Sequence, residues 1–292
     1  MRLGFLTNAL ITPELRHVAD LAEWAEQHGF SALEVGPTAV LDDDALRRLA
    51  EQGRVRVGCL TYCRNFLSGE EAVDREHQAE LMRRIAMAGD GGVPVIVTST
   101  GIRSQRGGFR YDGYESIRAK PKASMELVAS FFKGVMEAAE RHGVRVAVEN
   151  CPLMGNVAIS PDLWHEVLHR VDSPRLGIAY DPSHLIWQMI DPYAPIRELG
   201  DRIFHVHAKD TEILRDRLAR TGILTDFSWW RYRLPGLGEL DWTRFVSALQ
   251  EVGYDGMISI EHEDPVWSGS PERVRQGILI GKRFLEGVPG FQ

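Results

Sequence analysis

Short apolar stretches alternate with longer stretches of helical periodicity along the whole of this 292-residue chain. The short stretches predict strands at residues 2–8, 31–36, 54–60, 93–100, 144–150, 175–181, 202–210 and 256–261. The longer stretches predict helices at residues 14–28, 43–52, 69–88, 122–142, 161–171, 184–199, 242–252 and 271–285. Strands that alternate with helices pair in parallel, and eight such units in a chain of this length predict a closed (β/α)8 TIM barrel of the α/β class.

The composition shows no internal break, so we expect a single barrel domain over residues 1–292. A doubly wound open sheet is the competing arrangement, but no G-x-G-x-x-G follows the first predicted strand. Glycines that fit the left-handed position after a helix stand at residues 29, 53, 143 and 253. Two long connections, 101–121 and 211–241, each follow a strand, and we expect both to be functional loops on the catalytic face.

Charge and hydropathy exclude several classes of partner. The net charge of −7 and the pI near 5.8 argue against nucleic-acid binding, which needs a basic surface. No apolar run approaches the roughly 20 residues of a membrane-spanning helix, and the N-terminus reads as a strand rather than a signal peptide. Three cysteines without a C-x-x-C spacing suit a reducing compartment. We therefore expect a cytoplasmic protein that acts on a small molecule.

Four polar side chains end the small-residue faces of the predicted strands. Side chains alternate in direction along a strand, so Glu149, Asp181 and Glu261 share a face with small residues and oppose the branched apolar ones. Small residues leave room inside a barrel, and the carboxyl ends of its strands carry the chemistry. On the strand at 202–210 the same face holds His207. We expect all four side chains to meet at the barrel mouth.

Three carboxylates at close range repel one another unless a cation lies between them. Carboxylate oxygens with one imidazole nitrogen form a hard site that suits one divalent metal ion. We expect Mn²⁺, and Mg²⁺, Co²⁺ and Zn²⁺ are further candidates. The alternative for each acid is to cap the following helix or to pair with a basic side chain. Glu34, at the end of another predicted strand, could support this site or form an ordinary ion pair.

Around these residues the chain resembles the xylose isomerase-like barrel superfamily, in particular the sugar phosphate isomerases/epimerases, which are related to ketose 3-epimerases and inosose dehydratases. The resemblance covers nearly the whole chain and is carried by VAVENCPLMGN, IAYDPSHLIWQMID, HVHAKD, RLPGLGELDW and GYDGMISIEHEDP. It implies the metal ligands Glu149, Asp181, His207 and Glu261. It also implies that Glu149 and Glu261 transfer protons and that the protein forms a homo-oligomer, a dimer or a tetramer.

The resemblance also suggests substrate contacts. His184, three residues after Asp181, matches a substrate-contacting histidine of the epimerases, and Arg233 lies close to their substrate arginine. Lys209 in HAKD departs from the epimerases and is similar to relatives that act on inosose or on oxidised glycosides. Trp230 belongs to an aromatic and basic cluster on the connection 211–241, where sugar stacking and packing of the loop are alternatives.

These observations predict a divalent-metal-dependent isomerase or epimerase of a keto sugar that works through a metal-stabilised enediolate. A lyase is the first alternative, either an inosose-type dehydratase or an enzyme that cleaves a 3-keto-glycoside. DNA-repair endonucleases share the barrel, but their additional histidines and D-x-H are missing here. A non-catalytic barrel, which would tolerate Glu149→Gln, is the remaining alternative.

Overall fold

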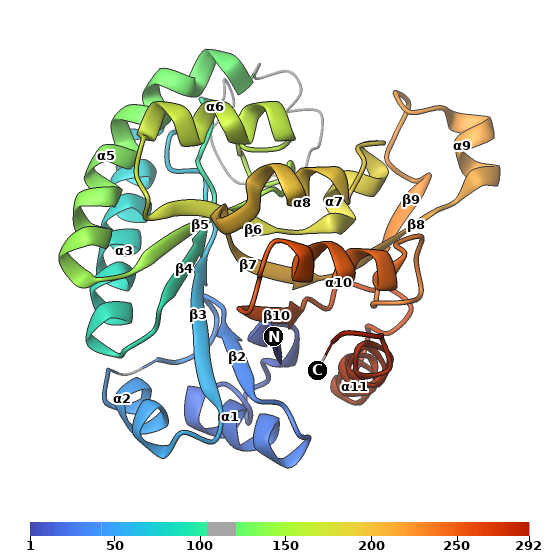
Figure 1. Ribbon diagram of the computed structural model, residues 1–292, viewed down its shortest axis with the longest axis horizontal. Helices are drawn as coiled ribbons and strands as arrows, with labels where there is room; N and C mark the ends of the chain where they lie inside the picture. The colour runs from blue at the N-terminus through green and yellow to red at the C-terminus, as the bar shows by residue number, and fades with distance from the viewer. Residues whose placement is uncertain (42, 104–120, 292) are drawn as a thin grey trace.

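The computed structural model describes residues 1–41, 43–103 and 121–291. Most of the connection 101–121, namely residues 104–120, therefore lies outside the described residues. Within the described part of the chain, eight parallel strands form one sheet in the order β1-β10-β7-β6-β5-β4-β3-β2 (Figure 1). The strands are β1 (Arg2–Phe5), β2 (Ala32–Val35), β3 (Arg56–Tyr62), β4 (Val95–Thr98), β5 (Arg145–Glu149), β6 (Leu176–Tyr180), β7 (Ile203–Ala208) and β10 (Met257–Ile260).

The first and last strands of that order lie side by side and close the barrel. A parallel bridge joins Leu6 to Glu34, and the amide of Ser31 donates to the carbonyl of Leu3 at 3.3 Å. The predicted (β/α)8 barrel is confirmed.

Helices surround the sheet on its outer face (Figure 1). They are α1 (Val18–Gln27), α2 (Asp43–Gln52), α3 (Glu71–Asp90), α5 (Met125–His142), α6 (Pro161–Val171), α7 (Pro182–Trp187), α8 (Ala194–Leu199), α10 (Trp242–Glu251) and α11 (Pro271–Glu286). The 3₁₀ turns are η1 (Thr7–Leu10), η2 (Pro121–Ser124) and η3 (Gly200–Arg202). The predicted left-handed glycines have φ between 68° and 72°, at residues 29, 53, 143 and 253. None of the helices in the described ranges is both long and apolar enough to cross a membrane.

The helix expected over 184–199 is wrong, because two short helices, α7 and α8, occupy that range. Met189 has a φ of 60°, a left-handed conformation that ends the first helix. Pro195 then lies in the first turn of the second helix, where a missing amide hydrogen is tolerated. The hydrophobic periodicity continues across residues 188–193, so the sequence pattern did not indicate the break between the two helices.

The connection 211–241 is not the plain loop that was expected. It contains an antiparallel hairpin of β8 (Asp210–Ile213) and β9 (Trp230–Arg233), with α9 (Arg215–Thr221) between them. We call these two strands the β8–β9 hairpin. In Figure 1 α9 extends beyond the barrel. Trp187, Ile213 and Trp229 form an apolar cluster that packs the hairpin against α7. Trp230 therefore lies on a strand.

The barrel interior is filled in layers. Near the amino-terminal ends of the strands, a Cβ on Gly4 would lie 2.2 Å from Met257 Cε, and a Cβ on Gly58 would lie 2.5 Å from Met257 Sδ. One methionine thus fills the space that the two glycines leave open. Above it is a small apolar cluster that consists of Cys59, Cys63, Val95, Val97, Ala147, Ala179 and Phe204. Met257 and this apolar cluster fill the barrel interior, and the polar side chains lie beyond them at the barrel mouth.

A bulge in the pairing of β6 with β7 sets the direction of the polar side chains. The register runs from Ile178 opposite Ile203 to Ala179 opposite His205, so Phe204 is the extra residue on β7. Phe204 packs in the interior cluster, and the next residue, His205, also contacts interior groups. Strand alternation then brings His207 to the same side.

Candidate active site

The four predicted metal ligands meet at the carboxyl ends of β5, β6, β7 and β10. Glu149 ends β5, Asp181 follows β6, His207 lies in β7, and Glu261 follows β10. One ligand atom from each lies within 4.8 Å of every other, and we call these four residues the acid–imidazole cluster. All four side chains are buried, Glu261 the least, with 12% of its side chain exposed. The predicted convergence is therefore present in the structure.

The imidazole of His207 connects the cluster to the barrel interior. Its Nδ1 lies 3.2 Å from Glu261 Oε2 and 3.5 Å from Glu149 Oε1. Its Nε2 lies 3.0 Å from Glu34 Oε1. Burial alone would lower the pKa of His207, but the carboxylates of Glu34 and Glu261 hold it well above its ordinary value. Glu34 therefore supports the site.

Below the cluster, Glu34 also accepts hydrogen bonds from two other side chains. Thr61 Oγ1 donates at 2.5 Å, and His205 Nε2 lies 2.9 Å from Glu34 Oε2. His205 is thus a hydrogen-bonded interior histidine, with the Cys59 thiol 3.8 Å away.

Asp181 both caps a helix and belongs to the cluster. Its side chain accepts from the amide of Ser183 at 2.9 Å through Oδ1 and so caps α7, while Oδ2 faces the cluster. The backbone of Asp181 forms two hydrogen bonds with the side chain of Asn150, at 2.8 and 2.9 Å. Asn150 follows Glu149 directly, so this amide sets the relative position of the two acidic ligands. The helix-capping and metal-binding interpretations of Asp181 are compatible.

Lys209 is buried against the acids. Its ammonium group lies 2.7 Å from Glu261 Oε2, 2.9 Å from Glu263 Oε2 and 3.0 Å from Asp181 Oδ2. The ring of Tyr232 covers it, with Nζ 4.4 Å from the ring centroid. Burial would lower the pKa of Lys209, but the facing carboxylates raise it, so the group stays charged. The site thus holds a fixed cation beside its anionic ligands.

His184 contacts both the cluster and the β8–β9 hairpin. Its Nε2 lies 3.2 Å from Asp181 Oδ2 and 3.6 Å from Glu149 Oε1. Its Nδ1 forms a hydrogen bond of 2.9 Å with the hydroxyl of Tyr232. Burial works against the charge, yet the neighbouring Cys151 and Asp181 raise the pKa of His184 to about 10.

The two glutamates of the cluster have different environments. Burial raises the pKa of both carboxyls. At Glu149, the neighbouring imidazoles of His184 and His207 outweigh burial and bring the pKa well below its ordinary value. At Glu261, burial prevails over the attraction of Lys209, and the pKa is raised. The thiol of Cys63 donates to Glu149 Oε2 at 3.3 Å.

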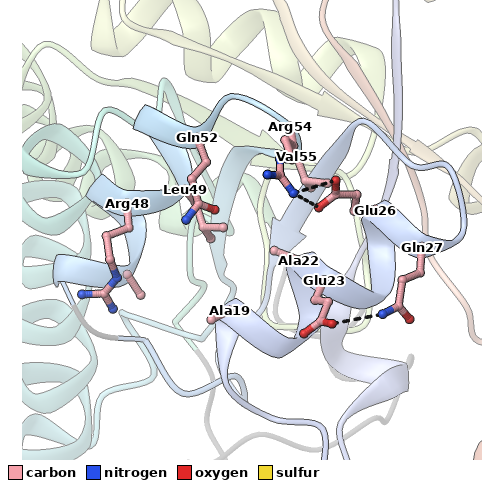
Figure 2. Close-up of a pocket in the computed structure, with 11 residues that line it drawn as sticks. Ala19, Ala22, Glu23, Glu26, Gln27, Arg48, Leu49, Gln52, Arg54 and Val55 are labelled. Carbon is pink, nitrogen blue, oxygen red and sulfur yellow. Dashed lines mark hydrogen bonds and ion pairs between the residues drawn. The ribbon is translucent and has the colours of Figure 1, made fainter.

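The cluster opens into a cavity of about 130 Å³. Glu149, His207, Lys209 and Glu261 line one part of it, and Asn8, Arg64, Met154 and Tyr232 are among its other lining residues. A larger cavity of about 620 Å³ lies between α1 and α2, where Figure 2 shows the Glu26–Arg54 ion pair and the Glu23–Gln27 hydrogen bond. Residues of the acid–imidazole cluster do not line this outer pocket, so size alone does not mark the site.

Of the four predicted substrate residues, Lys209 lines the 130 Å³ cavity, whereas His184, Arg233 and Trp230 do not. Arg233 donates to Asp264 Oδ2 at 2.9 Å and also binds Glu212, so it fastens the hairpin to the segment after β10. Trp230 stacks on Trp187, with ring centroids 4.7 Å apart and an interplanar angle of 2°. His184 and Lys209, in contrast, lie at the cluster.

Sequence reasoning missed Tyr232, which lines the cavity in the region where Arg233 was expected. Trp230 and Tyr232 share one face of β9, with their rings 4.8 Å apart, and Arg231 and Arg233 alternate with them. This two-residue alternation in WRYR is the signal for a strand, and it was available in the sequence. Asn150 and Cys63 carried no such signal, because their contacts join different strands.

The residues present fit a divalent metal ion. Asp181 Oδ2 and His207 Nδ1 are buried, and among the described residues they have charged neighbours, Lys209 and Glu261, but no contact with hydrogen-bond geometry. They face each other across the same space as the glutamate oxygens, and three carboxylates with one imidazole form a hard donor set. Glu34 occupies the position of an outer partner that orients a ligating histidine.

Comparison with known proteins gives a family match over most of the chain. Residues 22–284 match the sequence profile described as xylose isomerase-like TIM barrel. The uncharacterized protein YfiH of Bacillus subtilis is 35% identical over 149 residues, which cover 48% of this chain and 47% of that protein. The first curated relatives are matched over less than two thirds of their own length, 47%, 41% and 25%.

Two further similarities extend over nearly the whole chain. An inosose dehydratase of Clostridium beijerinckii is 23% identical over 267 residues, covering 90% of this chain and 87% of that enzyme. Among solved structures, a D-psicose 3-epimerase with D-tagatose from Clostridium cellulolyticum H10 superposes with a TM-score of 0.71. It is 15% identical and covers 97% of this chain and 98% of its own.

Proposed function

The chain belongs to the xylose isomerase-like TIM barrel family, and on that premise we propose that it is a divalent-metal-dependent isomerase or epimerase of a keto sugar or sugar derivative. The observation that carries the proposal is the placement of Glu149 and Glu261 on either side of His207 at one cavity. Two carboxylates that reach one substrate from different strands can remove a proton from carbon and return one.

The side chains of the site have distinct parts in this reaction. Glu149, Asp181, His207 and Glu261 would hold the metal, for which Mn²⁺ is the expected ion and Mg²⁺, Co²⁺ and Zn²⁺ are alternatives. When bound, such an ion polarises a carbonyl and stabilises negative charge on the substrate oxygens. Glu149 or Glu261 takes the proton from the carbon next to the carbonyl, which leaves an enediolate. The other glutamate returns a proton to the opposite face, and the configuration at that carbon inverts.

The surrounding residues orient the substrate. His184 presents Nε2, a buried atom without a hydrogen-bond partner in the described part of the chain, beside Glu149 and Asp181. We assign it a hydrogen bond to a substrate oxygen. Arg233 and Trp230 do not contact the substrate in this proposal. Their contacts stabilise the β8–β9 hairpin.

A lyase reaction is the second candidate, and Lys209 favours it. Its ammonium group lies at the cavity beside Glu261, within reach of an oxygen that leaves as water or as an aglycone. Elimination from the same enediolate would need such an acid. The inosose dehydratase similarity supports this candidate, and the epimerase similarity supports the first.

We further propose a cytoplasmic location and a homo-oligomer, dimer or tetramer. The three free cysteines suit a reducing compartment, and the net charge of −7 disfavours nucleic acid as a partner.

The test is incubation of the purified protein with Mn²⁺ and a panel of keto sugars, inososes and 3-keto-glycosides in D₂O. Deuterium that enters next to the carbonyl with inverted configuration and no other mass change supports the epimerase. Loss of water or aglycone supports the lyase. Glu149→Gln and Glu261→Gln should each lower the rate by about 10²- to 10⁴-fold.

The matched control is Glu23→Gln on α1, an exposed residue of the outer pocket, which should keep wild-type activity. If Glu149→Gln turns over any of these sugars at the wild-type rate, the assigned proton transfer is wrong. Absence of exchange and of mass loss with every sugar would leave the non-catalytic barrel as the better account.

A further inference from the structure

Tyr232 lies at a junction between the β8–β9 hairpin and the acid–imidazole cluster. β8 starts at Asp210, directly after Lys209, so the hairpin extends the β7 segment that carries His207 and Lys209. In the hairpin register Tyr232 pairs with Thr211, whose hydroxyl donates to the carbonyl of Ser183 at 2.8 Å. The strand opposite Tyr232 is therefore bonded to α7, the helix that holds His184.

Other contacts make the position of Tyr232 rigid. On one side Trp230 stacks on Trp187 of α7, and the Trp230 and Tyr232 rings are in contact. On the other side Arg233 donates to Asp264, and the amide of Leu234 donates to the same carboxylate at 3.1 Å. Tyr232 is thus fixed from both neighbours on its strand.

Tyr232 uses two parts of its side chain at the site. Its hydroxyl bonds to His184 Nδ1 at 2.9 Å, and its ring face covers the Lys209 ammonium at 4.4 Å. An imidazole has two nitrogens, and the bond at Nδ1 fixes the ring so that Nε2 faces Asp181 and Glu149. Without that bond, rotation about the side-chain torsions would be free to turn Nε2 away from Asp181 and Glu149.

We propose that Tyr232 is a positioning residue whose hydroxyl holds His184 Nε2 toward the substrate, so that the β8–β9 hairpin forms part of the catalytic machinery. This inference rests on the proposed function, in which His184 contacts a substrate oxygen. Tyr232 touches the cavity, but its hydroxyl is used by His184 and its effect on the reaction passes through that ring.

The experiment compares Tyr232→Phe with the wild type in the Mn²⁺-loaded enzyme. Phenylalanine keeps the ring over Lys209 and removes only the hydroxyl. Partners that orient a ligating histidine matter by about 10- to 100-fold in activity, and by analogy we expect a roughly tenfold fall in kcat with little change in KM. A loss confined to KM, or wild-type kcat, would overturn the proposal.

A second readout does not depend on turnover. Ring ¹H–¹⁵N spectra of both proteins, with the His184 signal identified by its loss in His184→Gln, should show that signal shifted or broadened in Tyr232→Phe. The signals of His165 on α6 and of His28 at the end of α1 should stay unchanged. An unchanged His184 signal would overturn the proposal even if no sugar is turned over. Failure of the wild type in D₂O with a shifted His184 signal would instead count against the proposed function and support the positioning.

The control variant is Tyr193→Phe. Its hydroxyl accepts from the amide of Asp241 at 2.9 Å, so the variant also removes a hydrogen bond, away from the cavity. Its kcat and the His184 signal should match those of the wild type. Equal effects from both variants would show a general loss of stability rather than positioning and would overturn the proposal.

Discussion

The carboxylate of Glu34 holds the imidazole of His207 by its Nε2, with 3.0 Å between that nitrogen and Oε1. This contact turns the other ring nitrogen toward Glu149, Asp181 and Glu261. Glu34 itself is fully buried and accepts additional hydrogen bonds from Thr61 and His205. The orientation of the His207 imidazole therefore depends on Glu34 of β2, a residue far in sequence from the cluster.

Replacement Glu34→Gln should weaken metal binding. A glutamine has one acceptor oxygen, which cannot serve Thr61, His205 and His207 as the carboxylate does. We expect the affinity for Mn²⁺ to fall by about 10- to 100-fold, as for other outer partners of ligating histidines. Isothermal titration calorimetry measures this, with Glu23→Gln as the control. An unchanged Kd would show that Glu34 does not orient His207.

Replacement Lys209→Met should destabilise the metal-free protein. The side chain is almost completely buried among the carboxylates of Asp181, Glu261 and Glu263, and loss of its charge removes the ammonium that these three share. Breaking a buried ion pair from one side costs about 3–5 kcal/mol. Urea unfolding at neutral pH checks the value, and Lys133→Met on the exposed face of α5 should change stability by less than about 0.5 kcal/mol.

The same variant separates the two candidate reactions. If Lys209 supplies the proton for a leaving group, Lys209→Met should lose elimination activity while it keeps deuterium exchange next to the carbonyl. Equal retention of both activities would assign Lys209 to charge balance alone.

Metal binding should stabilise the fold. Because the donor atoms come from four strands, an ion that binds them favours the native state, by about 2.7 kcal/mol at a hundredfold excess over Kd. Differential scanning calorimetry with Mn²⁺ should give a higher Tm than with a chelator. Asp181→Asn should reduce this difference in Tm, and a full wild-type response in that variant would place the ion elsewhere.

Replacement Asp210→Asn should destabilise the segment after the hairpin. The Asp210 carboxylate accepts from Thr211 and Leu240 amides at Oδ1, and from the Gly236 amide and Trp242 Nε1 at Oδ2. An asparagine offers only one acceptor oxygen, and each buried donor left unsatisfied costs about 1–3 kcal/mol. Urea unfolding should show this loss. Exposed Asp255→Asn is the control, and equal stabilities would contradict the assignment.

The parts of the site that follow local rules could be predicted from the sequence. Glu149, Asp181 and Glu261 each end a strand face of small residues, and period-two alternation is enough to bring them to one rim. The bulge at Phe204 did not disturb this prediction, because it lies below His205 and His207 on β7. Glu34 was noticed for the same reason, as the polar end of an apolar strand.

Contacts between distant segments could not be predicted in this way. The pairing of β8 with β9 joins residues about twenty positions apart, and its register decides that Tyr232, rather than Arg233, lines the cavity. Similarly, the break at Met189 depends on one left-handed backbone conformation that hydrophobic periodicity does not encode. These features arise from tertiary packing, which overrides local patterns.

Met257 limits the size of the side chains that the barrel interior can hold near the amino-terminal ends of the strands. Met257 reaches across the axis into the room left by Gly4 and Gly58, and a methyl group at either glycine would collide with it. In a diverging lineage, a larger residue at 58 is therefore admissible only alongside a shorter one at 257. A larger residue at 4 is excluded in either case, because its Cβ would also lie 2.5 Å from the carbonyl oxygen of Ala32. Covariation between sites 58 and 257 in an aligned set of descendants would record that shared volume, while site 4 would remain glycine.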